Sequence, residues 1–494
     1  MGRGHSAVRS HSRPAEKQKR NRSVSVSVLR RKMVEAKQAT KVQLEDAAAG
    51  LPSNAFPRFA GKTQGNDEDQ SGRSLSRPRK GLTVSKAIRD LVDEDYEASE
   101  DENERPSHPD VMSKYKLAGK IVDDTLDMIC KKCSAGASTK DLCAMGDKEL
   151  YNRCRGVFRT AKNPETGEPM KRGICFPTTI SVNHILCHHT PFHDGEATIL
   201  QPNDVVKVHM GAHVDGFPVT AARTIFVPDT GDVATGTEGS PPSPAAANAW
   251  LAAYYAMKQL VEHLRPGAVN HDLTTLIEST VARFPGIILV EGVLSNRTKR
   301  WIIDGSDCII STRILDQEPF QDVDFTEVKE GQVWTLDVAV TTASSRRLQT
   351  TETNETNIFR RNQFTGLLRL SSGERTLHEI RSFYQCFPFQ ARQSPEPLKT
   401  RLGLSALRKA DMVDAFPVLQ CKKGYVTVRF SCTVAVQKNR TTFVAGTLPA
   451  ISPHVLSAAS VVVPAEFAAP VDNVLSDERA SKKRRKDATN VSTD

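Results

Sequence analysis

Two histidines, His209 and His213, could bind a metal ion or transfer protons if the fold brings them together. They lie in segment 205–224, whose residues alternate as in a half-buried strand and its hairpin partner. Residues four apart on a strand point to the same face of the sheet. With His188 the pair could form a metal site, although buried histidines that only pack and hydrogen-bond are more common. The sequence alone leaves both interpretations open.

A second motif with metal-ligand spacing is Cys130-Lys-Lys-Cys133. The chain has ten cysteines. Zinc would need a second pair of ligands. The other cluster of Cys and His residues consists of Cys187, His188, His189 and His193. A pair with this spacing more often consists of ordinary thiols at the end of a helix than of zinc ligands. The scattered positions of the ten cysteines indicate reduced thiols in the cytosol or nucleus.

A basic cluster near the end of the chain has the composition of a nucleic-acid contact. Its residues are Lys482, Lys483, Arg484, Arg485 and Lys486. Such a cluster is a nuclear localisation signal, a phosphate-binding patch or simply solvated charge. The net charge of +9 and a second basic segment at the N-terminus favour nucleic acid, because bound cations release the counterions of phosphates. No known RNA-binding motif is present, so we expect contacts to backbone and shape rather than to bases.

Several motifs between about residues 106 and 455 resemble those of type II methionine aminopeptidases. Residues 173–183 (GICFPTTISVN) and the following 188–191 (HHTP) are similar to G-x-A-F-P-T-x-x-S-x-N and H-x-T-P. Segment 205–224 resembles the hairpin K-I-D-x-G-x-x-x-x-G-x-x-x-D, whose two aspartates hold two divalent ions. Segments 291–295, 334–337 and 429–433 are similar to G-H-S, Y-A-I-E and Q-F-E-H-T.

This resemblance implies five metal-ligand positions and one histidine that contacts substrate. The substrate histidine corresponds to His188. The ligand positions correspond to His209, Thr220, Val293, Asp337 and Ser431. Two bridged divalent ions require anionic oxygens, and Asp337 alone supplies a carboxylate. We therefore expect a vestigial cleft with no catalytic residues, no metal and no cofactor.

Four short segments are more similar to non-catalytic relatives with the same fold. They are KYKL at 114–117, VDGF at 214–217, WIIDG at 301–305 and MVDAFP at 412–417. These relatives are the proliferation-associated, ErbB-receptor-binding proteins and the nuclear export factors of the pre-60S ribosome. The resemblance implies a pseudoenzyme of the methionine aminopeptidase-like, pita-bread superfamily that binds ribosomes, RNA and partner proteins.

Local patterns predict an α+β fold, with the pita-bread arrangement implied by the resemblance. The expected elements are an apolar helical face over 117–129, a capping box at Ser138–Asp141 that starts a second helix, strands and hairpins over 174–227, a loop over 228–244, and helices over about 245–264 and 271–284, the last with Asn270 as a possible cap. The internal duplication expected of the fold is not visible as sequence repetition.

The expected domains follow from composition and from the same resemblance. Residues 1–105 are basic and then acidic, with too few apolar residues to pack, and are expected to be disordered. Residues 106–465 form the pita-bread domain, with a type II-like helical insert at about 375–416 and a polar, mobile loop at 341–374. Residues 466–494 form a disordered basic tail.

The sequence therefore predicts a non-catalytic protein that binds the large ribosomal subunit and its rRNA, beside ribosomal proteins near the exit region. Its expected roles are in 60S biogenesis, nuclear export or at the peptide exit, as a monomer in the cytoplasm and the nucleus or nucleolus. No apolar run approaches the roughly 20 residues that span a bilayer, so no membrane contact is expected. The alternatives are a metal-dependent aminopeptidase with rearranged ligands (His188, His209, His213 and Asp337), and a transcriptional regulator that binds DNA or RNA.

Overall fold

The computed structural model describes residues 108–163, 167–228, 240–313, 323–350, 356–362 and 371–462 of the 494 residues. The expected disordered extension at 1–105 and the basic cluster Lys482–Lys486 lie outside the described residues, so what was expected of them stays a prediction. No helix within the described ranges has the length and apolar character of a membrane-spanning segment.

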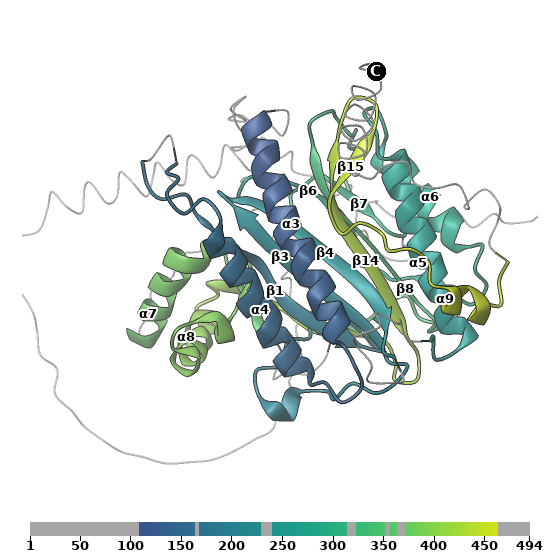
Figure 1. Cartoon of the computed structure of the whole chain (residues 1–494), viewed down its shortest axis with the longest axis horizontal. Helices are drawn as coiled ribbons and strands as arrows, with labels where there is room; N and C mark the ends of the chain where they lie inside the picture. Colours follow the sequence, from purple (N-terminus) through teal and green to yellow (C-terminus); the bar gives the residue numbers. More distant parts are fainter. Residues whose placement is uncertain are drawn as a thin grey trace, which may run out of the picture. The chain divides into compact units, whose positions relative to one another are not determined.

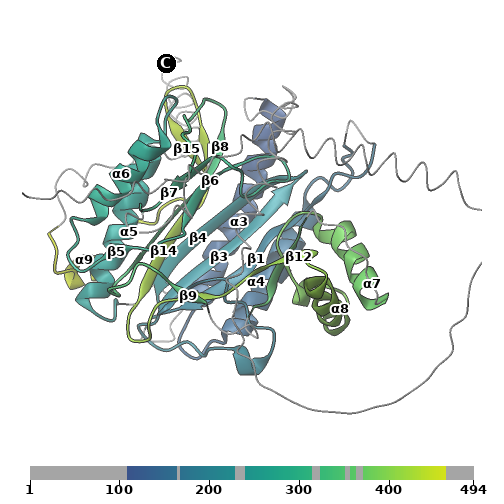
Figure 2. The same ribbon diagram turned by 180° about the vertical axis from the view of Figure 1, so that it is seen from behind.

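A nine-stranded antiparallel sheet forms the centre of the described structure (Figures 1 and 2). Its strand order is β1-β3-β4-β14-β8-β6-β7, with β15 paired to β14 and β5 paired to β8. The strands are β1 (Arg172–Val182), β3 (Val205–Val214), β4 (Phe217–Phe226), β5 (Ile288–Leu289), β6 (Leu294–Thr298), β7 (Cys308–Ile310), β8 (Val333–Thr341), β14 (Thr427–Val436) and β15 (Thr441–Ala445). The alternation in 205–224 correctly predicted the β3–β4 hairpin, but β3 is buried on both faces and not half-buried as expected.

The turn of that hairpin shows why its residues are needed. Asp215 and Gly216 both have positive φ values, 54° and 82°, as the tight turns that match strand twist require. A Cβ atom on Gly216 would lie 2.3 Å from the ring of Trp301. Glycine is therefore required both by the backbone and by the close approach of the indole.

Four helices cover one face of the sheet in two pairs (Figure 1). They are α3 (Pro109–Lys132), α4 (Thr139–Gly156), α5 (Pro244–His263) and α6 (Asn270–Val281). The first pair packs on β1, β3 and β4 in one apolar cluster, and the second pair belongs with β8 and β14 to another. The duplication that the sequence hides is thus visible as two helix pairs on one sheet.

Two predicted helix starts were wrong in detail. Ser138 is the N-cap residue of α4, but its side chain makes no capping hydrogen bond, and its backbone forms a β-bridge with Ile199. Val269, not Asn270, is the N-cap of α6. The Asn270 side chain accepts the N–H of His271 in the first turn at 3.0 Å, and it also donates to the carbonyls of Cys308 and Asp324, which are far along the chain. Asn270 therefore joins the start of α6 to distant segments, whereas the predicted capping box at Ser138 does not form.

Segments 341–374 and 375–416 contain more strand than the sequence predicted. The first includes β9 (Gln349–Thr350) and β10 (Ile358–Arg361), so its described part is not a plain loop. The second holds helices and two short strands, because the alternating residues near 413–416 pair with β10. Its elements are α7 (Ser371–Glu379), a π-helical turn (Ile380–Tyr384), β11 (Phe389–Gln390), a 3-10 turn (Ala391–Gln393), α8 (Pro397–Lys409) and β12 (Val413–Phe416).

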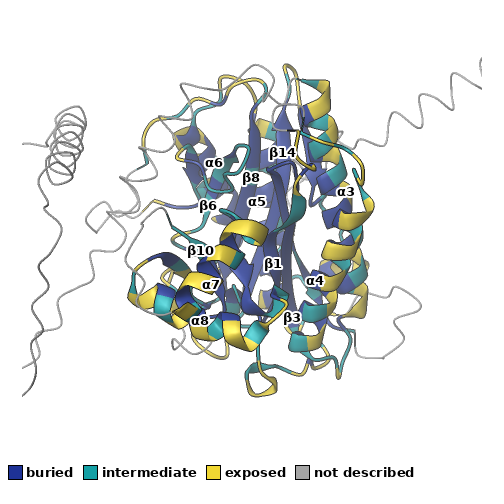
Figure 3. Cartoon of the chain, turned by 90° about the vertical axis from the view of Figure 1, so that its left-hand side faces the viewer, coloured by how far each residue is buried: buried dark blue, intermediate teal, exposed yellow. Residues whose placement is uncertain are grey.

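The remaining short elements complete the described structure. They are β2 (Ile185–Cys187), β13 (Leu419–Gln420), a 3-10 turn (Asp194–Glu196) and α9 (Pro453–Ala458). Strands β10, β11 and β12 form one small sheet and β2, β9 and β13 form another. Figure 3 shows α7 and α8 at the outside with exposed surfaces, beside the buried strands of the large sheet.

Candidate functional site

The face of the large sheet opposite the four helices carries the predicted site residues, and we call it the inner face. His209 lies directly across from Ala222, and Ala222 from Ser431, which lies across from Asp337. Directly paired residues point to the same face, so these four share the inner face. Thr220, two residues from Ala222 on β4, shares it too. The structure therefore brings together four of the five predicted ligand positions.

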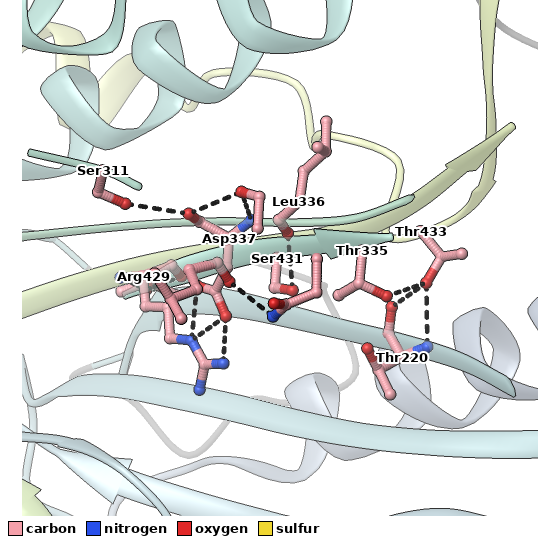
Figure 4. A network of polar contacts seen from close by, with 12 residues as sticks. Thr220, Ser311, Thr335, Leu336, Asp337, Arg429, Ser431 and Thr433 are labelled. Atoms are coloured by element: carbon pink, nitrogen blue, oxygen red, sulfur yellow. Dashed lines mark hydrogen bonds and ion pairs between the residues drawn. The ribbon is translucent and has the colours of Figure 1, made fainter. Parts of the chain in front are cut away.

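Asp337, the one carboxylate among them, is already paired with a cation (Figure 4). Arg429 Nε donates to both Asp337 oxygens at 2.9 and 3.0 Å, and Arg429 Nη2 donates to Asp337 Oδ2. Asp337 is 6% exposed and Arg429 is 9% exposed. Burial opposes the positive charge of Arg429, but attraction to the neighbouring Asp337 more than offsets burial and raises the pKa of Arg429. The carboxylate is therefore neutralised from within the chain.

The Ser431 side chain and the Thr220 backbone are held by hydrogen bonds to neighbouring strands (Figure 4). The Ser431 hydroxyl donates to the carbonyl of Leu336 at 2.8 Å. The Thr220 N–H donates to Thr433 Oγ1 at 3.0 Å, and that hydroxyl donates back to the Thr220 carbonyl at 2.8 Å. These bonds knit β4, β8 and β14 together. They offer neutral oxygens, not the anionic bridges that two divalent ions require.

His209 is buried against an aromatic ring. Its ring centroid lies 4.4 Å from that of Phe176, and its Nδ1 has no hydrogen-bond partner among the described residues. Burial and then the nearby Arg429 and His188 lower its pKa far below the ordinary value, so it is neutral. A neutral imidazole can bind a metal, but here it stands next to a guanidinium.

His213 and His188 are turned to other neighbours. His213 lies 4.7 Å from the ring of Phe387 and accepts a hydrogen bond from the Gly216 N–H at 3.3 Å. His188 Nδ1 lies 2.9 Å from the carbonyl of Pro417. Burial lowers the pKa of His213 to about 3 and that of His188 to about 4. Both are neutral and each has its own structural contact.

Val293, the fifth predicted position, is partly buried and has only apolar contacts beside this group. Its side chain packs against the apolar cluster of Leu186, Cys187, Val290 and Ala339. A valine side chain has no atom that can coordinate a metal ion. The alignment with G-H-S stays a prediction, but the residue present is part of the core.

The donor set does not fit the metal pair that the resemblance implies. In the described part of the chain, no group of three or more His, Cys, Asp or Glu residues could hold a metal ion. The rearranged site of His188, His209, His213 and Asp337 therefore does not assemble, nor does the zinc site of Cys130, Cys133 and their candidate partners. All ten cysteines are free thiols, eight of them buried.

Arg429 is the site residue that sequence reasoning missed. It was noted only as part of the segment similar to Q-F-E-H-T. The available signal was a single cation in strand 427–436, which is otherwise apolar or hydroxylated. A second inner-face cation, Lys207, donates to the Asn183 carbonyl at 2.7 Å, and burial lowers its pKa to about 7. The inner face thus holds two basic side chains, of which Arg429 is charged and Lys207 is only partly protonated near neutral pH.

Comparisons with known proteins agree with this geometry and with the motif order. The model of Metallopeptidase family M24 matches residues 113–350. Proliferation-associated protein A of Dictyostelium discoideum is 31% identical over 334 residues, which are 67% of this chain and 81% of that protein. The chain belongs to metallopeptidase family M24. The family and its proliferation-associated branch, expected from the sequence motifs, are confirmed.

Two further comparisons bear on the relatives and on the fold. The Curved DNA-binding protein of Schizosaccharomyces pombe is 28% identical over 345 residues, 69% of this chain and 85% of that protein. The solved structure of a thermophilic Arx1 matches with a TM-score of 0.62 at 22% identity, covering 73% of this chain and 97% of that chain. The pita-bread fold of family M24 and the mixed α and β structure are thereby confirmed.

Proposed function

We propose that this member of family M24 is a pseudoenzyme that cleaves no peptide bond and acts as a binding protein. The observation that carries the proposal is the buried ion pair between Asp337 and Arg429. A catalytic metal pair activates water through its positive charge, and the ions must be held by anionic ligands. Here the single carboxylate is bound by a guanidinium, which cannot activate water.

We propose further that its partner is the large ribosomal subunit, contacted through rRNA. The net charge of +9 and the cluster Lys482–Lys486 support this, because dense phosphate attracts and orients cationic segments. The motifs shared with the pre-60S export factors support a role in 60S biogenesis, nuclear export or at the peptide exit. The protein then works as a monomer in the cytoplasm and the nucleus or nucleolus, beside ribosomal proteins of the exit region.

Sedimentation through a sucrose gradient at low and raised salt tests this proposal. The tagged full chain is compared with a chain cut after Val474 and with a full chain in which Lys482–Lys486 are all Gln. We expect migration with 60S particles that weakens steeply with salt and weakens in both variants. Migration of the intact chain only in the light fractions at low salt would remove the ribosome from the proposal.

A second candidate function is binding to DNA, as the name of the Schizosaccharomyces pombe relative states for that protein. The same cationic segments would serve it, since phosphate contacts carry no sequence information. RNase treatment of the native assembly separates the two. Loss of the assembly after RNase indicates RNA, whereas survival together with release by DNase indicates DNA.

A further inference from the structure

A basic surface at the end of α4 lies on the helix-covered side of the sheet, not on the inner face. Residues 148–172 contain seven Lys or Arg and three Asp or Glu. They include the last turns of α4, the loop that follows and the first residue of β1. So strong a charge imbalance on one stretch is the electrostatic footprint of a polyanion partner.

Two of the seven cations have structural roles. Arg153 Nε donates to Glu149 at 2.7 Å, and its Nη1 donates to Asp124 of α3 at 3.0 Å. Arg172 Nε donates to the carbonyl of Cys154, near the C-terminus of α4, at 3.0 Å. These contacts join the two helices and fasten the start of β1 to the helix end. Arg153 and Arg172 are therefore used by the fold itself.

The other five are exposed and make no ion pair or side-chain hydrogen bond with any residue that the structure describes. They are Lys148, Arg155, Arg159, Lys162 and Lys171. With Tyr151 and Asn152 they make up what we call the α4 surface. A group of cations without acidic partners on a folded domain costs repulsion, which a bound polyanion would relieve.

Helix geometry places these side chains together. Lys148, Asn152 and Arg155 are four and three residues apart, so they lie on one face of α4 and span about 10 Å of its axis. The loop then folds back on itself, because the Met170 N–H donates to the carbonyl of Ala161 at 3.0 Å. Its basic residues therefore stay near the helix end. Exposed residues lie along the outward side of α4 in Figure 3.

An aromatic ring stands among the cations. Tyr151 is 53% exposed, and the Arg155 guanidinium lies over its ring at 5.6 Å from the centroid. The ring is therefore accessible to a ligand from solvent. Aromatic rings and guanidinium planes are the surfaces on which unpaired bases stack, and the surrounding cations suit the phosphates on either side.

We propose that the α4 surface binds single-stranded RNA. One unpaired base stacks on Tyr151, while Lys148, Arg155 and Arg159 contact neighbouring phosphates. Asn152 lies on the same helix face and offers a donor and an acceptor to the ribose 2′-hydroxyl, the group that distinguishes RNA from DNA. The choice of nucleic acid rests on the proposed function, but the surface does not depend on the tail or on the ribosome.

The test is fluorescence anisotropy of the full chain with a labelled, unstructured 12-nucleotide RNA. The surface variant is Lys148→Gln, Arg155→Gln, Arg159→Gln. We expect its affinity to fall roughly tenfold near 0.1 M salt, and the slope of log affinity against log salt to fall by about 2, as for three single-strand phosphate contacts. The residues are exposed, so the melting temperature should stay unchanged.

A matched control removes three exposed cations near the end of another helix, α5. The control variant is Arg265→Gln, Lys438→Gln, Arg440→Gln, at sites joined by the hydrogen bond from Thr441 to the Leu264 carbonyl. It has the same net charge as the surface variant. We expect it to bind the RNA as the wild type does. Equal weakening in both variants would overturn the proposal, because only net charge would then matter.

The role of the ring is tested by Tyr151→Leu. Loss of one base stack should weaken binding about tenfold without changing the salt slope. The same 12-mer as single-stranded DNA should bind more weakly than the RNA, and equal binding would overturn the assignment to RNA. Unchanged affinity of the surface variant would end this inference and leave ribosome binding through the tail untouched. Absence from 60S fractions would in turn leave the oligonucleotide result standing.

Discussion

The two faces of the nine-stranded sheet use the same strands for different purposes. On the helix-covered face, alternate residues such as Trp334, Leu336 and Phe430 are almost wholly buried in one apolar cluster with α5 and α6. On the inner face, the intervening positions include Asp337 and Ser431, which are buried too but bound by hydrogen bonds and an ion pair. Apolar packing therefore stabilises the helix-covered face, while hydrogen bonds and an ion pair hold the buried polar side chains of the inner face.

Two neighbouring substitutions on β14, one on each face of the sheet, should show the largest difference in stability. Phe430→Ala removes a ring that meets Trp250 edge-on at 5.2 Å, and should lower the free energy of unfolding by about 4 kcal/mol. Ser431→Ala, one residue along, loses one hydrogen bond and should cost only about 1 kcal/mol. Urea denaturation of the two variants measures both values. Similar losses would mean that the two faces do not differ as described.

The ion pair on the inner face can be tested in isolation. Asp337→Leu or Arg429→Met alone leaves one buried charge without its partner, which should cost about 3 kcal/mol. The double variant Asp337→Leu, Arg429→Met removes both charges and should unfold within about 1 kcal/mol of the wild type. Urea titrations of all four proteins close the cycle. A double variant as unstable as the two losses added together would show that the pair is not coupled.

Acid stability should report the buried inner-face histidine. An unfolded histidine has a pKa near 6.5, and burial lowers the pKa of His213 to about 3. Between these values the unfolded chain binds a proton that the folded chain does not, so stability falls as pH falls. The loss is at most about 1.4 kcal/mol per pH unit. His213→Gln should flatten the profile in this window, and an unchanged slope would contradict the assignment.

On the helix-covered side, Asp123 should have the opposite effect. Its carboxylate accepts the Gly446 N–H at 2.7 Å, and burial raises its pKa to about 6. As pH falls from about 6 to the unfolded value of 3.8, the folded chain takes up the proton first and gains stability. Asp123→Asn should remove this smaller gain and steepen the acid loss. A shallower loss in the variant would contradict the sign.

Short-range patterns predicted much of the fold. The alternation in 205–224 predicted the β3–β4 hairpin, and the apolar spacing after Leu117 predicted the buried face of α3, although Leu117 itself is only partly buried. These features depend on neighbours within a few residues. The strand at 413–416 was missed because its partner, β10, lies more than fifty residues earlier.

The site could be predicted only in part, for the same reason. Motif order located His209, Thr220, Asp337 and Ser431, and the sheet register does bring them together. The partner of Asp337 is 92 residues away, and no local signal marks Arg429 as that partner. Its significance depends on the pairing of β14 with β8, which only the three-dimensional structure shows.

Metal content per chain tests the central claim most directly. The full-length protein is equilibrated with excess Mn²⁺, passed over a desalting column and measured by mass spectrometry of the metal. With Arg429 bound to the carboxylate of Asp337, we predict far less than one ion per chain. Two ions per chain, lost in the variant Asp337→Asn, would contradict the account. The inner face would then hold a metal pair like that of the catalytic members of the family.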